Sequence, residues 1–465
     1  MDDSNSRRNR ILALLFTGVL MGALDIAIIG PALPAVREAF GIDERAAAWM
    51  ITIYVLFNLI GTPVMAKLSD RFGRRSVYAA DVALFGFGSL LVAAAPTYRW
   101  VLAGRAVQGL GAGGIFPVAS AVIGDVFPPE RRGAALGLIG AVFGIAFLVG
   151  PILGGLLLLL SWHWLFLVNL PIAAAVVWGA LRVLPSAGAP RPQPFDLAGM
   201  AVLTAMLAAF AVGLNRLDAQ ALLSSLAAPG VWPLLAAAAA LAIAFPAIER
   251  RAADPIIRPA LFRSRQVRIA SGLSLGAGVV EAAVIFVPAL LVAAFGVTAS
   301  TAAFMLLPIV IAMGVGAPVF GRLLDRFGSR VVIIASTVLL TAGSALVAAF
   351  PATLWLFYAA GMAIGLGLAG LMGSSLRYVM LNEAPSGDRG AAQGVLTVFI
   401  SIGQLAGAAV LGAIIASRGG DPASYGTAFL LVALLMAALT LAALRLRSRS
   451  AEHRRMRETA DVQAP

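Results

Sequence analysis

Long apolar runs separated by short polar segments make up most of the chain. A helix that crosses about 30 Å of hydrocarbon needs about 20 apolar residues, because each helical residue rises by about 1.5 Å. The pattern predicts fourteen spans, at residues 11–31, 48–66, 76–95, 100–123, 134–160, 164–184, 197–215, 231–248, 267–292, 301–321, 331–349, 353–376, 391–416 and 425–444. We interpret the first run as a span and not as a cleaved signal peptide, because it carries Asp25 in its middle and has no small-residue cleavage site.

The composition excludes other classes of protein. Of 465 residues, 60% are hydrophobic and 12% are charged, against about 25% charged residues in soluble domains. A soluble fold cannot hide that much apolar surface, and a disordered chain lacks it. The absence of Cys and the presence of only two His predict no metal site. The single lysine, Lys67, is not part of a phosphate-binding loop, so we expect no ATP-driven transport by this chain.

The basic residues predict the orientation in the membrane. If the N-terminus is cytoplasmic, 28 Lys and Arg lie on the cytoplasmic side, five lie on the opposite side, and Arg105 lies inside a span. This asymmetry follows the positive-inside rule and predicts a cytoplasmic-membrane protein with both termini in the cytoplasm. The net charge of +12 is then an orientation signal, and we expect no binding to nucleic acid. The basic tail is expected to contact anionic lipids.

An internal repeat divides the chain into two halves. AKLSDRFGRRSV at 66–77 recurs as GRLLDRFGSRVV at 321–332, and RGAALG at 132–137 recurs as RGAAQG at 389–394. Parallel repeats with a substrate site between them are typical of transporters. We therefore predict an all-α polytopic membrane protein with an N-terminal six-helix half (1–184), a linker with two inserted helices (185–266), a C-terminal six-helix half (267–447) and a cytoplasmic tail (448–465).

Three motifs resemble those of the major facilitator superfamily, and in particular its fourteen-span drug:proton antiporter branch. They are AKLSDRFGRR at 66–75, the fourth-span pattern Arg105-x-x-Gln108-Gly109-x-Gly111, and the fifth-span pattern Gly150-Pro151-x-x-Gly154-Gly155. The chain departs from the usual patterns at Ala66 and Ala146, where glycine is common. The resemblance implies the major facilitator fold and proton-coupled export of amphipathic or lipophilic compounds. It implies no enzyme activity and no cofactor, with the proton gradient as the energy source.

Two of these motifs have expected mechanical roles. The resemblance implies that the turn between spans 2 and 3 latches the cytoplasmic side shut; the alternative is that its charges mark the membrane boundary. The latch residues would be Asp70, Arg71, Arg74 and Arg75, together with Asp125 and the second copy's Asp325. Gly150 and Pro151 predict a kink in span 5, while Gly154 and Gly155 predict close helix approach, with tight packing alone as the alternative. Two G-x-G-x-x-G matches, at 109–114 and 365–370, lie inside apolar spans and are interpreted as helix-packing surfaces.

Ionisable residues inside spans are costly, and each is a candidate functional site. They are Asp25, Asp81, Arg105 and Glu281. Asp25 and Glu281 are 256 residues apart, which is the repeat offset, so we expect them at equal depth and facing each other across a cavity. Buried acids can load and release protons near neutral pH. The alternatives are that Asp25 or Glu281 is permanently paired, for example with Arg105, and that Asp81 only satisfies the arginines of the 2–3 turn.

Polar and aromatic residues in the spans are candidates for the substrate cavity, although each aromatic could equally pack between helices. They are Asn58, Gln108, Ser274, Gln404, Phe116, Phe143, Phe286, Phe304 and Trp355. The favoured function is a monomeric, proton-coupled exporter whose partners are small amphipathic substrates, protons and membrane lipids. One alternative is export of an endogenous lipid, siderophore or metabolite on the same fold. Another, from a different class, is a membrane receptor or scaffold that does not transport.

Overall fold

The structure is a computed structural model, and it describes residues 2–42, 44–185, 196–217, 221–253, 255–297, 299–385, 388–450 and 452. Every regular element in these ranges is helical, which confirms the all-α prediction. The elements of the N-terminal half and the insertion are α1 (Asp2–Phe40), α2 (Glu44–Phe72), α3 (Arg74–Ala93), α4 (Tyr98–Val126), α5 (Pro129–Leu158), α6 (Trp164–Leu167), α7 (Asn169–Val183), α8 (Leu197–Asn215), α9 (Leu222–Leu226) and α10 (Trp232–Glu249). The remaining elements are η1 (Pro259–Arg263), α11 (Arg265–Ile285), α12 (Val287–Phe295), α13 (Ala299–Met305), α14 (Leu307–Phe327), α15 (Ser329–Ala349), α16 (Leu354–Gly370), η2 (Leu371–Ser375), α17 (Leu376–Glu383), α18 (Arg389–Ser417) and α19 (Pro422–Ala443).

The long helices agree with the predicted spans. Within the described residues, 13 helical stretches are long and apolar enough to cross a membrane. The 30-residue helix α5 lies at the predicted fifth span, so the predicted number of fourteen is met. The twelfth span differs from its prediction, because α16, η2 and α17 run on without interruption to Glu383. Arg377, which we expected in the following loop, therefore lies inside a span.

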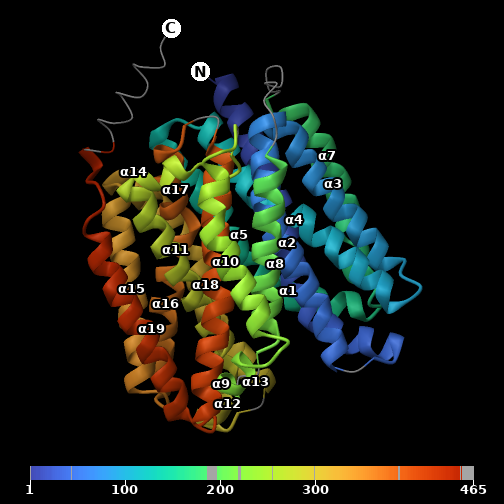
Figure 1. Cartoon of the computed structure of the whole chain (residues 1–465), viewed down its shortest axis with the longest axis vertical. Helices are drawn as coiled ribbons and strands as arrows, with labels where there is room; N and C mark the ends of the chain where they lie inside the picture. Colours follow the sequence, from blue (N-terminus) through green and yellow to red (C-terminus); the bar gives the residue numbers. More distant parts are fainter. Residues whose placement is uncertain are drawn as a thin grey trace.

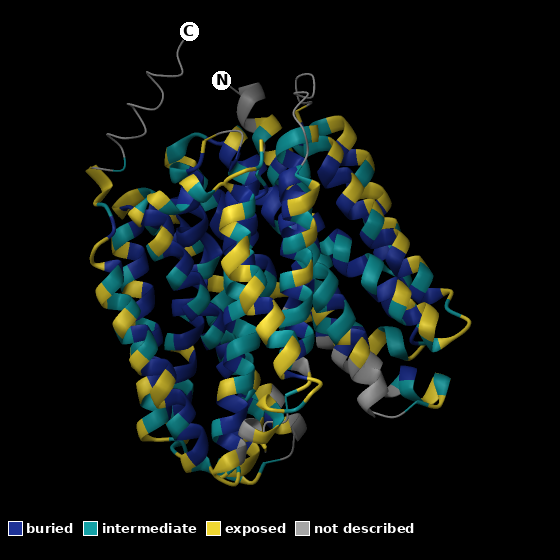
Figure 2. Ribbon diagram, in the orientation of Figure 1, coloured by how far each residue is buried: buried dark blue, intermediate teal, exposed yellow. Residues whose placement is uncertain are grey.

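The helices form two groups that lie side by side (Figure 1). Helices α1 to α7 pack against one another, and α11 to α19 form the second group. The inserted helices α8 and α10 pack together, and α8 also contacts α2 and α18, one helix from each group. Buried residues follow the helix contacts, and exposed residues follow the outer faces (Figure 2). We call the end where α1 begins and α19 ends the terminal end, and the opposite end the far end.

Close glycine contacts set the spacing of the helices within a group. A Cβ atom added to Gly109 would lie 2.4 Å from the carbonyl oxygen of Tyr54 on α2, and one added to Gly111 would lie 2.5 Å from that of Asp81 on α3. Only glycine allows such an approach of two backbones. The first G-x-G-x-x-G segment is therefore a helix-packing surface, as predicted.

The two groups meet mainly toward the terminal end. Helix α5 packs on α14 from Gly133 to Gly144, and a Cβ on Gly144 would lie 2.4 Å from the Cα of Gly314. Beyond this point large apolar side chains of α5 are exposed, including Val149 (40%) and Ile152 (63%). The described contacts thus hold the halves together at one end.

Candidate functional site

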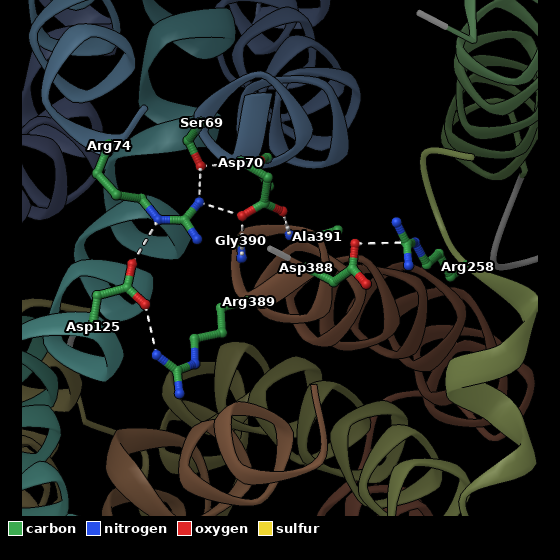
Figure 3. Close-up of polar contacts among 10 residues, drawn as sticks. Ser69, Asp70, Arg74, Asp125, Arg258, Asp388, Arg389, Gly390 and Ala391 are labelled. Atoms are coloured by element: carbon green, nitrogen blue, oxygen red, sulfur yellow. Dashed lines mark hydrogen bonds and ion pairs between the residues drawn. The ribbon is translucent and has the colours of Figure 1, made fainter. Parts of the chain in front are cut away.

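A carboxylate of the N-terminal half holds the start of a helix in the C-terminal half. Asp70, in the last turn of α2, accepts hydrogen bonds from the backbone N–H groups of Gly390 (3.0 Å) and Ala391 (2.8 Å) at the start of α18 (Figure 3). These N–H groups have no partner within their own helix, and the helix dipole favours a negative charge at this position. The side chain of Asp70 is only 3% exposed. Asp70 therefore links the two halves directly.

Arg74 extends this contact into a charged network. Its guanidinium pairs with Asp70 and donates to Ser69 Oγ at 2.8 Å. It also pairs with Asp125 at the end of α4, with 3.1 Å between Nε and Oδ2. The other oxygen of Asp125 accepts from Arg389 Nη1 at 2.7 Å, so the chain of charges runs from α3 through α4 to α18 (Figure 3). The structure thus brings Asp70, Arg74 and Asp125 together across the two halves.

The second copy of the motif makes the equivalent contact in the opposite direction, from the C-terminal half to the N-terminal half. Asp325 at the end of α14 accepts from the backbone N–H groups of Gly133 and Ala134, both at 2.9 Å, within the first two turns of α5. Arg132 Nη1 donates to Asn382 Oδ1 at 3.2 Å, in the position that corresponds to the pair between Arg389 and Asp125. Each half therefore binds two backbone N–H groups near the start of a helix in the other half, and we call each of these contacts a cap. We call these two caps and their neighbouring polar pairs the terminal gate.

The three arginines predicted for the latch are placed differently from one another. Arg71 lies over the ring of Phe72, 5.3 Å from its centroid, and Arg75 forms no hydrogen bond or ion pair with a described residue. Arg74 is thus the arginine of the predicted cluster that pairs with both Asp70 and Asp125.

A contact that the sequence did not predict joins the start of α18 to the segment before α11. Arg258 Nε lies 3.1 Å from Asp388 Oδ1, directly before the N–H groups that Asp70 binds (Figure 3). The side chain of Asp388 is 4% exposed, whereas that of Arg258 is 46% exposed. This pair therefore fixes the first turn of α18 from the side opposite to the cap.

A second polar network is buried entirely inside the N-terminal half. Arg105 Nη1 of α4 lies 2.6 Å from Asp25 Oδ2 of α1 and 2.9 Å from Gln108 Oε1. Gln108 Nε2 donates to Asp25 Oδ1 (3.2 Å) and to Ser89 Oγ of α3 (2.7 Å). Asn169 Nδ2 of α7 donates to Asp25 Oδ1 and Ser89 Oγ, both at 3.3 Å. Side chains of α4 and α7 thus bind the carboxylate of α1, and Ser89 of α3 completes the network behind them.

The surroundings of this ion pair compensate for the loss of water. Asp25 is 0% and Arg105 is 1% exposed. The guanidinium also lies 4.2 Å from the ring centroid of Tyr54 and donates to the Met50 carbonyl oxygen at 3.3 Å. Removal of one partner from a buried pair leaves an uncompensated charge, at a cost of about 3–5 kcal/mol. In this conformation Asp25 is paired with Arg105, the partner that one of the alternatives named.

Glu281 does not share a site with Asp25. It lies on α11, is partly exposed, and forms no hydrogen bond or ion pair with a described residue. Among the described residues, the polar partners of Asp25 come from its own half, and Asp25 is 0% exposed. The expectation that the two acids face each other across a cavity was therefore wrong for this conformation. The reason is Arg105, which holds the carboxylate inside the helix bundle. The C-terminal half has no arginine at the matching position, which is Gly361.

The fifth-span motif places a glycine against the helix of the buried acid. A Cβ on Gly150, for which the sequence predicted a kink, would lie 2.4 Å from the Cβ of Ala27 on α1, so the two helices approach closely there. Gly155 is exposed with no atom within 4 Å of such a Cβ, so close approach was the wrong expectation at that position. Gly154 is buried, and α5 continues as a helix through Pro151, whose side chain is outside the described residues.

The predicted cavity residues fall into three groups. Gln108 and Ser274 are fully buried; Gln108 belongs to the Asp25 network, and Ser274 Oγ bonds to the Ala270 carbonyl oxygen of its own helix. Phe304 and Trp355 are 70% and 68% exposed. The partly exposed candidates are Asn58, Phe116, Phe143, Phe286 and Gln404. Gln108 and Ser274 are therefore structural in this conformation, and the partly exposed set remains the candidate lining.

Arg377 is a functional candidate that the sequence did not identify. It follows the π-helical turn η2, a type of distortion that is frequent at functional sites. Its side chain is 3% exposed, lies 3.6 Å from the ring centroid of Phe116 on α4, and donates to Gln393 Oε1 at 3.2 Å. Phe116 in turn contacts Phe143 of α5 edge to face. This cation–π contact therefore joins the two halves inside the terminal gate.

Asp81 is also placed differently from its prediction. It is 0% exposed on α3, beside Gly114 of α4, and neither carboxylate oxygen has a hydrogen-bond partner among the described residues. It therefore does not satisfy the arginines of the turn between α2 and α3. Its position against a glycine explains how a polar side chain fits between two packed helices.

Two helical halves joined by reciprocal caps have the architecture of a secondary transporter. Comparison with known proteins agrees. The sequence matches the Major Facilitator Superfamily over residues 15–262 and 268–463. It is 37% identical over 398 residues to YfiU, an uncharacterized MFS-type transporter of Bacillus subtilis (strain 168), covering 84% of this chain and 77% of the relative. It is 31% identical over 430 residues to the tetracenomycin C resistance and export protein of Streptomyces glaucescens, covering 88% and 76%.

A solved structure supports the fold. The human organic anion transporter MFSD10 matches with a TM-score of 0.68 and 18% identity, covering 92% of this chain and 99% of that one. The chain belongs to the major facilitator superfamily. It is a multi-pass membrane protein that transports small-molecule substrates, and it is not an enzyme.

Proposed function

We propose that this protein is a proton-coupled exporter of amphipathic or lipophilic compounds that works by alternating access. The terminal end is the cytoplasmic side, as the 28 basic residues assigned to that side favour. The cargo enters from the cytoplasm or the inner leaflet when the terminal gate opens. Relatives named for multidrug resistance or antibiotic export support the choice of substrate class.

The observation that carries the proposal is the fully buried pair of Asp25 and Arg105. A proton on Asp25 removes its charge and weakens its hold on Arg105. Because the network of this carboxylate includes groups of α1, α3, α4 and α7, the change reaches four helices at once. Gly150 packs α5 against α1 two residues beyond the acid, and α5 carries the gate contact with Asp325. Protonation can therefore bias the gate through α5.

The test uses purified protein in proteoliposomes with an imposed pH gradient. We expect uptake of a lipophilic cation, such as a fluorescent dye, into vesicles acidic inside, with proton release that stops when an ionophore collapses the gradient. Asp25→Asn should bind the dye but not respond to the gradient. Dye movement that persists without any gradient would contradict proton coupling and leave facilitated diffusion or another coupling ion.

A further inference from the structure

A basic pocket opens at the terminal end of the N-terminal half. It has a volume of about 750 Å³, and its lining includes Arg7, Arg8 and Arg10 of α1 and Arg182 of α7. Among the described residues, no acidic side chain lines it, and none of the four arginines forms an ion pair there. The one described hydrogen bond of these arginines runs from Arg10 to Ser6 Oγ at 3.2 Å. The charged side chains that line the pocket, among the described residues, are therefore all positive.

An apolar groove begins beside this pocket. It lies between α3 and α7, has a volume of about 460 Å³, and is lined by apolar residues that include Phe87, Leu90 and Ala174. The groove reaches Trp178 and Leu181 in the last turns of α7, directly before Arg182. The guanidinium of Arg182 lies 4.8 Å from the Trp178 ring centroid, so one contact joins the two hollows.

We propose that the pocket and the groove together bind one anionic glycerophospholipid of the leaflet at the terminal end. The phosphate lies among the arginines, whose planar guanidinium groups bind phosphate oxygens in pairs. An acyl chain runs from this level along the groove toward the middle of the membrane. Basic pockets between helices on the cytoplasmic side are suited to anionic headgroups.

Both hollows are needed for this assignment. A free phosphate would not use the apolar groove, and a zwitterionic lipid or an uncharged cargo would not require four arginines. The bound lipid ties the start of α1 to the end of α7, and both helices contribute to the Asp25 network. The proposal does not depend on proton coupling, since binding can be measured without transport.

The experiment measures lipid binding to the detergent-purified full chain by native mass spectrometry, with dioleoyl phosphatidylglycerol and dioleoyl phosphatidylcholine as probes. We expect the anionic lipid to bind at least about tenfold more tightly to the unmodified protein, because only its headgroup carries a net negative charge for the arginines. Arg8→Gln/Arg182→Gln should abolish this preference. The matched control Arg250→Gln/Arg251→Gln, which removes two exposed arginines outside the pocket, should retain it. If the double variant does not fold, the lipid preference is measured on the single variant Arg182→Gln.

A second pair of variants tests the groove. Ala174→Trp fills it and should weaken phosphatidylglycerol binding, while Ala175→Trp, an exposed position on the same helix outside the groove, should not. Equal binding of the two lipids to the unmodified protein would overturn the proposal, as would equal preference in the two arginine variants. If glycerol 3-phosphate displaces the lipid completely and Ala174→Trp has no effect, the pocket binds phosphate alone and the lipid assignment is wrong.

Discussion

The reciprocal caps predict that Asp70→Asn opens the terminal gate more often than Asp325→Asn. An asparagine keeps one acceptor oxygen but turns an N–H₂ group toward a backbone N–H. Each variant therefore loses one charge-assisted hydrogen bond, worth about 1.5–3 kcal/mol. Asp70→Asn also removes one of the two carboxylate partners of Arg74, whose equivalent in the second copy is Ser329.

These losses translate into gate populations. A loss of about 3 kcal/mol at Asp70 changes the ratio of closed to open gate by roughly 150-fold, and a loss of about 2 kcal/mol at Asp325 changes it by roughly 30-fold. Ala66 is 0% exposed behind the gate and lies against Gly394 of the other half. A cysteine there reports opening, and the chain has no native Cys to interfere.

The assay measures the rate at which a bulky thiol reagent labels Ala66→Cys in nanodiscs. In the limit of fast opening and closing, this rate is proportional to the open fraction. We expect labelling to be slowest with the unmodified gate, faster with Asp325→Asn and fastest with Asp70→Asn. Ser76→Cys, on the exposed face of α3, should label at one rate in all three backgrounds. Equal labelling of Ala66→Cys with and without the Asp70→Asn substitution would refute the reasoning, and faster labelling with Asp325→Asn than with Asp70→Asn would refute the ranking.

Three further predictions concern the ionisable residues inside the spans. Asp25→Asn should abolish gradient-driven transport and lower the free energy of unfolding by about 3 kcal/mol, because Arg105 loses its carboxylate partner. The double variant Asp25→Asn/Arg105→Gln should regain thermal stability but not transport. If it regains transport, the pair has no role in coupling. Glu281→Gln should impair export of lipophilic cations more than of neutral compounds in the same vesicles, and an equal loss of both would make Glu281 a general structural residue. Arg377→Gln should speed labelling behind the gate roughly 30-fold, because a desolvated cation–π contact contributes about 2 kcal/mol. Phe116→Leu should act through the same contact, so fully additive effects in the double variant would disprove it.

The local pattern of the sequence predicted where the helices lie along the chain, but not which polar side chains meet between them. Apolar runs bounded by arginines located the spans, because the length of a span depends on the hydrocarbon thickness and its ends depend on the cost of placing a charge in the membrane. The Asp25 network joins residues up to 144 positions apart, Asp25 and Asn169, and neither spacing nor composition indicates which side chains meet. The repeat alignment therefore identified Asp25 and Glu281 as equivalent positions in the sequence, but it did not show that their surroundings differ.

One segment was assigned wrongly from the sequence, and one pair of contacts was missed. The segment RYVMLNE after residue 376 looks like a loop because it carries several residues that can ionise or hydrogen bond, but it is the buried end of a span. Burial against α11 and α18 of its own half, with further contacts to α4 and α5 of the other half, and not hydropathy, keeps it helical. The caps could have been found, since RGAA precedes a span in both halves at nearly the same distance from the repeated Asp, 62 residues after Asp70 and 64 after Asp325.

The two halves carry matched caps with mismatched charge. Asp125 pairs with two arginines, Arg74 and Arg389, whereas the equivalent Asn382 only accepts a hydrogen bond from Arg132. The side chain of Asp125 is 32% exposed, so salt screens its pairs, while Asp70 at 3% is protected from it. Of the two sides of the gate, the one around Asp125 is therefore the more sensitive to ionic strength.

This mismatch gives the last prediction. Asp125→Asn makes the first copy resemble the second and removes two partly exposed ion pairs, for a loss of about 1 kcal/mol in total. Labelling of Ala66→Cys should then rise about fivefold at low salt, and the remaining rate should no longer depend on salt. In the unmodified gate, labelling should rise between about 0.05 and 0.5 M salt as the Debye length shortens. If the salt dependence survives in Asp125→Asn, the screened contact is elsewhere, and the charge of Asp125 does not set the strength of this side of the gate.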